Sequence, residues 1–279
     1  MQYKTIQTFL TDADTLPDLL ARSEQLAERF DAHLDAICLG VDRTQTGYYY
    51  AEGSALLVQE SLTRAELEAQ ALERQARKIL TSSAARWALP TEVAQMIDLG
   101  RHVTAHAGFA DLVVLPRPYG DGRGIELEPL LEAALFDGRA PILVLPDSGA
   151  CAPRPETIVL AWNESPQAMA AARAALPFLR AAKTVHVLVI DPPTHGPGRS
   201  DPGGMLANWL ARHGARPRVQ VQARTLPRIS DVILRHAEEV GAGMVVMGAY
   251  GHSRFREAIL GGATREMLQK AALPVLMAH

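Results

Sequence analysis

The chain has 279 residues, of which 48% are hydrophobic and 21% charged, with a formal net charge of −3. This composition is typical of a globular protein large enough to form one large domain or two ordinary ones, and the charge gives no support to nucleic-acid binding. The apolar runs are too short to span a bilayer, and residues 1–11 lack the apolar segment of a signal peptide. We therefore expect a cytoplasmic protein without a membrane partner.

In the first half of the chain, short apolar segments alternate with amphipathic stretches. A long helix is predicted from Ser54 to Trp87 and a shorter one near 101–109. One face of the long helix is an apolar stripe, which we interpret as core packing, with a groove for a partner helix as the alternative. The stripe consists of Leu62, Ala65, Ala69, Leu72, Ala76 and Ile79. Strands are predicted near residues 4–10, 34–39, 92–97, 111–115 and 141–145.

The second half shows the same alternation, which indicates a parallel α/β sheet. Its predicted strands are residues 157–162, 184–190, 218–223, 243–247 and 274–278. Its predicted helices are residues 165–181, 202–213, 228–240 and 263–271.

The two halves also resemble each other in sequence. Ala110–Leu115 is echoed 132 positions later by Ala242–Met247, and Arg139–Leu145 is echoed 133 positions later by Ala272–Ala278. Such self-similarity indicates a duplicated domain, and a turn- and proline-rich stretch at 147–155 would link the copies. We expect two tandem five-stranded parallel-sheet domains with a Rossmann-like α/β fold, residues 1–146 and 156–279.

Glycines surround the loop between the fourth strand and the last helix of the second half. Gly248 and Gly251 follow the strand, and Gly261 and Gly262 precede the helix. Glycine lets the backbone approach a ligand closely, and a helix N-terminus attracts anions, so this pattern predicts a phosphate cradle. Thr264 would add a hydroxyl donor. The alternative is that these glycines merely end a strand and start a helix.

With the strand–loop–helix motif and the duplication, the chain resembles the tandem universal stress proteins (UspA-like) over essentially its whole length. The family's motif is Gly, two residues, Gly, nine residues, Gly, then Ser or Thr. Here three glycines match, and Gly262 stands in the hydroxyl position. The resemblance implies an adenine nucleotide alpha hydrolase-like fold that binds ATP, alone or with Mg²⁺, at the crevice where strand order reverses. The missing hydrogen bond is worth about 0.5–1.5 kcal/mol, or roughly tenfold in affinity.

The resemblance also implies which residues would contact the nucleotide. Asn163, where the family usually has Asp, would bond the adenine or ribose side, and Val189 would flank the base. The phosphates would order the loop 251–261 and alter a partner surface. The implied binding set is Ala161, Asn163, Val189, Met247, Gly248, Gly251, Gly261, Gly262, Ala263 and Thr264.

The first half departs from the family motif. Pro116 and Tyr119 replace the first two motif glycines, and proline has no amide to offer a phosphate. Glu126 and Glu128 precede the helix that would receive the anion, and their charges would repel it. We therefore expect at most one nucleotide per chain. The first half would pack against the second, as in tandem members of the family, and two chains pairing is the default expectation for assembly.

Two other patterns match a metal site and a hydrolase nucleophile only in part. His102 and His106 have metal-ligand spacing on a helix, but no Cys or third His lies nearby, and an exposed polar face is the alternative. Ser253 follows Gly251 and His252 as in a hydrolase elbow, but the closing glycine is absent.

No Walker sequence and no assignable general base is present, so we expect no catalytic residues and a nucleotide-responsive or purely structural stress-response module, not primarily an enzyme. Two rival functions stay open. One is a slow ATP-hydrolysing or phosphotransfer enzyme that uses the same site. The other is a nucleotide-free protein-interaction module whose pocket has decayed.

Overall fold

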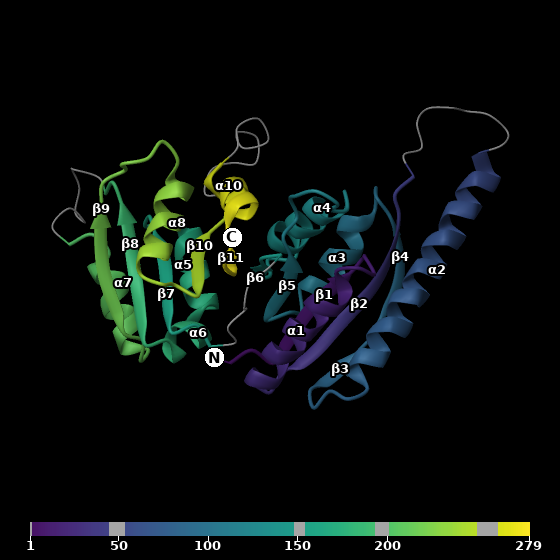
Figure 1. The fold of residues 1–279 in the computed structure, drawn as a ribbon, viewed down its shortest axis with the longest axis horizontal. Helices are drawn as coiled ribbons and strands as arrows, with labels where there is room; N and C mark the ends of the chain where they lie inside the picture. The colour runs from purple at the N-terminus through teal and green to yellow at the C-terminus, as the bar shows by residue number, and fades with distance from the viewer. Residues whose placement is uncertain (1, 45–53, 148–153, 193–200, 250–261) are drawn as a thin grey trace. The chain divides into compact units, whose positions relative to one another are not determined.

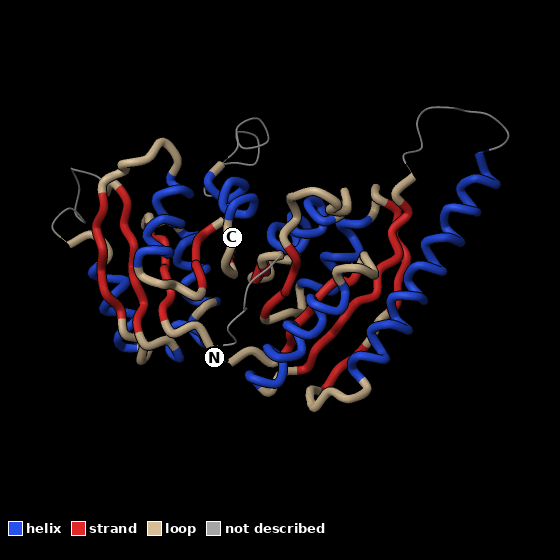
Figure 2. The backbone as a smooth tube through the Cα atoms, in the orientation of Figure 1, coloured by secondary structure: helices blue, strands red, loops and turns tan. Residues whose placement is uncertain are grey.

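The protein is described by a computed structural model over residues 2–44, 54–147, 154–192, 201–249 and 262–279. It forms two compact units, an N-terminal unit of Tyr3–Ala140 and a C-terminal unit of Pro141–His279 together with Gln2. Helices flank the strands of each unit (Figures 1 and 2). The domain boundary expected at residues 147–155 stays a prediction, and most of that segment lies outside the described residues.

The described strands of the N-terminal unit form a parallel sheet. Its order is β3-β2-β1-β5, and β4 continues the pairing of β2 beyond β3. The elements are β1 (Thr5–Leu10), α1 (Leu16–Phe30), β2 (His33–Asp42), α2 (Ser54–Leu80), β3 (Arg86–Ala88), β4 (Thr91–Gln95), α3 (Leu99–Ala107), β5 (Leu112–Pro116), α4 (Leu127–Glu132) and the π-helical turn η1 (Ala133–Asp137).

Helix α2 packs along β2 and β4 (Figure 1). The apolar stripe predicted on this helix is core over its middle, where Ala65, Ala69, Leu72 and Ala76 are buried, whereas Leu62 and Ile79 are partly exposed. Gly40 of β2 faces α2 so closely that a Cβ there would overlap the backbone of Ala65, so this contact requires glycine. The predicted extension of the helix to Trp87 is wrong, because the chain turns after Leu80 and forms β3 beside β2.

The C-terminal unit contains five parallel strands, as expected, and β6 is added antiparallel to β11. The order is β6-β11-β10-β7-β8-β9. The elements are β6 (Ile142–Leu145), β7 (Thr157–Trp162), α5 (Pro166–Ala174), α6 (Leu176–Ala181), β8 (Thr184–Ile190), α7 (Gly204–Arg212), β9 (Pro217–Gln222), α8 (Ile229–Glu239), β10 (Met244–Gly248), α10 (Ala263–Lys270) and β11 (Val275–Ala278).

Two differences from the expected elements have local causes. The helix predicted over 165–181 is interrupted at Ala175, because Pro177 fits only the first turn of a helix and here lies in the first turn of α6. Strand β6, expected in the first domain, is grouped with the C-terminal unit, where Val144 lies opposite Val275 of β11. Within the described residues, no helix combines the length and apolarity needed to cross a membrane. The expected cytoplasmic location stays a prediction.

Candidate functional site

The strand order of the C-terminal unit reverses between β7 and β10. From β7 the chain continues to β8 and β9 on one side, and then to β10 and β11 on the other. Ala161 of β7 lies opposite Met247 of β10, so both strands end at the same edge. Open parallel sheets bind ligands at the carboxyl ends of strands at such a reversal. The structure therefore brings the predicted strand residues Ala161 and Met247 together at the edge of the sheet where the strand order reverses.

Asn163 takes part in starting helix α5. Its Oδ1 accepts hydrogen bonds from the backbone N and the hydroxyl of Ser165, at 3.2 and 2.7 Å. The Ser165 Oγ in turn accepts from the N–H of Ala168 at 3.1 Å and caps the helix. The side-chain oxygen of Asn163 is therefore hydrogen-bonded within the protein. The side chain is exposed, and its Nδ2 is the group that can donate a hydrogen bond to a ligand.

Gly248 ends strand β10 directly against the start of α5. A Cβ at this position would lie 2.5 Å from the backbone N of Ala168 and 2.7 Å from the carbonyl carbon of Gln167. Both atoms belong to the backbone and cannot move aside without shifting the helix. Packing alone therefore requires glycine here, a role that the sequence pattern did not reveal, since it indicated close approach to a ligand.

Helix α10 begins at the predicted phosphate position. Gly262 occupies the N-cap with extended backbone (φ −70°, ψ 164°) and supplies no side-chain cap. Gly262 and Ala263 are partly exposed, whereas Thr264 is buried with 4% of its surface accessible. The backbone at the start of this helix is therefore the more accessible part of the predicted cradle.

Val189 and the two remaining motif glycines complete the predicted set. Val189 is buried on β8 opposite Trp162, and a Cβ on Gly203 would lie 3.1 Å from its Cγ2. It is thus covered by the chain at the start of α7. Gly251 and Gly261 lie outside the described residues.

A charged contact near the start of α10 was missed from the sequence. Glu266 of the first turn is 3.3 Å from Nε of Arg228, and its Oε2 accepts a hydrogen bond of 2.8 Å from Ser230. Both partners lie at the start of α8. The ion pair offsets the charge of this carboxylate, which would otherwise oppose an anion bound at the helix start.

In the N-terminal unit, Glu126 and Glu128 were expected to repel an anion with free negative charges, but both carboxylates have partners within the protein. Glu126 is buried and ion-paired with Arg43 at 2.7 Å. Glu128 accepts a hydrogen bond of 2.8 Å from the hydroxyl of Tyr119. The protein's own side chains therefore fill this region, and Arg43 neutralises part of its negative charge. An anion is excluded because its place is already taken, not because the two carboxylates repel it.

The two histidines considered as metal ligands both face one carboxylate. His102 Nδ1 lies 2.9 Å from Glu92 Oε2, and His106 Nε2 lies 2.6 Å from Glu92 Oε1. Burial tends to raise the pKa of Glu92, but the hydrogen bonds and charges of the two histidines hold it below its usual value. Within the described residues, no group of three or more His, Cys, Asp or Glu side chains is arranged to hold a metal ion. Ser253 and its neighbours lie outside them.

Comparisons with known proteins agree on one family. The sequence model of the universal stress protein family matches residues 155–279. The universal stress protein Slr1230 of Synechocystis sp. is 39% identical over 46 residues, a span that covers 16% of this chain and 16% of that relative.

Solved structures extend the likeness to both units. A universal stress protein from Archaeoglobus fulgidus aligns with 98% of this chain and 95% of its own, at a TM-score of 0.69 and 14% identity. PA1789 from Pseudomonas aeruginosa, a functionally unknown protein, aligns over 98% and 92% with a TM-score of 0.57 and 15% identity. Residues 155–279 are therefore a universal stress protein domain, in a chain whose units together have the fold of a universal stress protein.

Proposed function

We propose that the C-terminal unit binds one adenine nucleotide, ATP, at the carboxyl ends of β7 and β10. The observation that carries this proposal is the start of α10, the helix that follows strand β10 in the chain. Its N-cap is Gly262, which has no side chain to cap the first amides of the helix. Helix N-termini favour phosphate through their unpaired amides and dipole. Membership of residues 155–279 in the universal stress protein family supports the same ligand class.

The other residues at these strand ends are compatible with a bound anion. Ala161 and Gly248 present small or absent side chains at the strand ends, and Arg228 offsets the charge of Glu266. Asn163 supplies a polar amide on the exposed side. In this proposal the protein is a nucleotide-responsive stress-response module, and occupancy of the crevice is the signal that a partner reads.

Substitution of Gly262 tests the proposal without damaging the helix. Asp is a favoured N-cap residue, so Gly262→Asp should keep α10 as stable as before or slightly more stable. Its carboxylate would stand where the phosphates bind. We expect isothermal titration calorimetry to show ATP affinity lowered at least about tenfold, because like charges brought together cost several kcal/mol.

Gly262→Ser is the matched control, since it adds a capping side chain without a charge. It restores a hydroxyl donor and should tighten ATP binding by up to about tenfold, corresponding to a hydrogen bond of about 0.5–1.5 kcal/mol. Equal ATP affinity for the Asp variant and the unmodified chain would contradict this location of the phosphates. Absence of any ATP binding by the unmodified chain would favour the nucleotide-free interaction module.

A further inference from the structure

Strand β2 of the N-terminal unit runs past the end of β1. Leu10, the last residue of β1, pairs with Cys38, whereas β2 continues to Asp42 beside β4. Arg43 follows at once, and its Nη2 donates a hydrogen bond of 3.0 Å to the carbonyl oxygen of Thr11, just beyond β1. Because β1 lies between β2 and β5, the guanidinium lies where the strand order of this unit reverses.

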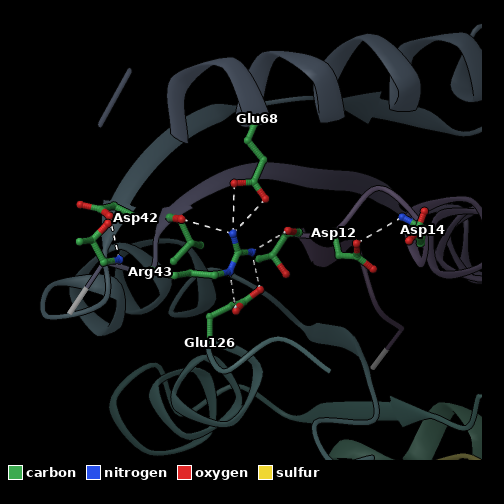
Figure 3. Close-up of polar contacts among 9 residues, drawn as sticks. Asp12, Asp14, Asp42, Arg43, Glu68 and Glu126 are labelled. Carbon is green, nitrogen blue, oxygen red and sulfur yellow. Dashed lines mark hydrogen bonds and ion pairs between the residues drawn. The ribbon is translucent and has the colours of Figure 1, made fainter. Parts of the chain in front are cut away.

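The guanidinium of Arg43 joins carboxylates from two other elements (Figure 3). Its Nε and Nη2 donate to Oε2 and Oε1 of Glu126 at 3.0 and 2.7 Å, a bidentate pair. Its Nη1 donates to both oxygens of Glu68 on α2, at 3.0 and 3.1 Å. One side chain thus connects the ends of β1 and β2 with α2 and with the residue that precedes α4.

Glu126 is the buried member of this cluster. Only 1% of its side chain is exposed, compared with 32% for Glu68 and 33% for Arg43. Burial alone would raise the pKa of Glu126, but the hydrogen bonds and charge of Arg43 hold it below its usual value. The hydrogen bonds that Arg43 donates to Glu126, opposed by burial, raise the pKa of Arg43 above its usual value. The pair is therefore ionised throughout the physiological pH range.

We propose that Glu126, neutralised by Arg43, is a built-in substitute for an anionic ligand at the crevice of the N-terminal unit. Glu126 occupies the N-cap of α4, and the corresponding N-cap of α10 in the C-terminal unit is Gly262. The second strand of each repeat is also followed by a different charge, since Arg43 follows β2 in the N-terminal unit and Asp191 follows β8 in the C-terminal unit. In this proposal the Glu126 side chain fills the position that an anionic ligand would take in the N-terminal unit. The inference goes beyond the nucleotide site proposed for the C-terminal unit and does not depend on it.

Chemical rescue of a truncated carboxylate tests this substitution in the full chain. Glu126→Ala removes the carboxylate and leaves Arg43 held by Glu68 and Thr11. A separate cleft of about 520 Å³, lined by Arg43, Asp42 and Glu68 but not by Glu126, leaves part of the Arg43 side chain open to small solutes. We expect a lower urea midpoint for unfolding of the N-terminal unit, recovered progressively by sodium acetate, which can bind Nε and Nη2 bidentately. Sodium chloride at matched ionic strength should not restore it.

Two charge-only variants keep the inference testable if the truncated protein fails to fold. Glu126→Gln should lower the urea midpoint clearly more than Glu68→Gln, because only Glu126 is fully buried against the guanidinium. Equal losses for the two variants would overturn the proposal, because both carboxylates would then be ordinary partners of Arg43. Equal recovery of Glu126→Ala in acetate and chloride would overturn it as well.

Discussion

Gly248 offers a direct test of why glycine stands at the end of β10. Replacing it by alanine places a Cβ 2.5 Å from the N of Ala168 and 2.7 Å from the C of Gln167, against an ordinary contact of 3.4–4 Å. Overpacking of this kind costs about 1–3 kcal/mol, and the loss of unfolded-state freedom returns about 0.4–1 kcal/mol. Taking the middle of both ranges, we expect Gly248→Ala to lower the free energy of unfolding of the C-terminal unit by about 1.3 kcal/mol.

The assay is urea unfolding of the full chain without nucleotide, followed by intrinsic fluorescence and far-ultraviolet circular dichroism. Gly100→Ala on α3 is the matched control, since its nearest contact for a Cβ is 3.7 Å away and alanine favours a helix. It should be neutral or stabilising. If Gly248→Ala unfolds like the unmodified chain but binds ATP more weakly, the packing argument is wrong and the glycine serves the ligand alone.

Three further predictions follow from packing and titration. Ser165→Ala should lower the free energy of unfolding of the C-terminal unit by about 0.5–2 kcal/mol in urea titrations, because it removes the cap of α5; an unchanged value would show that the cap contributes nothing. Gly40→Ala should destabilise the N-terminal unit by about 1–3 kcal/mol, because α2 must move away from β2; thermal unfolding at the unmodified midpoint would contradict that close contact. Burial lowers the pKa values of His186 and His236, so the folded C-terminal unit resists protonation; its urea midpoint should stay level above about pH 7 and fall as the pH drops through about 6.5, and His236→Gln should weaken that fall.

The sheet of the C-terminal unit could be predicted from the sequence because buried parallel strands are short apolar runs bounded by turns. β7 and β8 have the predicted bounds, 157–162 and 184–190. Helix α1 was not predicted, although Pro17 in its first turn and the spacing of the apolar residues Leu16, Leu20 and Phe30 are signals of a helix. Strand β3 has three residues and no signal of its own, so helical periodicity was extended through it.

The candidate site was predictable where it depends on neighbours along the chain. The N-cap of α10 at Gly262 follows from a glycine before a helical pattern, and the capping role of Ser165 could have been read from Pro166, which follows it. The occupant of the N-terminal crevice could not be predicted in this way. Arg43 meets Glu68 and Glu126, which are 25 and 83 residues away in sequence, so only the fold brings them together.

The most direct measurement of the central claim is the stoichiometry of ATP binding to the full chain, by equilibrium dialysis with radiolabelled nucleotide at saturating concentration. We predict one ATP per unmodified chain. The Gly262→Asp variant should lose this ATP, and the Glu126→Gln variant should keep it. Two equivalent sites would contradict the closed N-terminal crevice. No bound ATP at saturating concentration would contradict the nucleotide site proposed between β7 and β10.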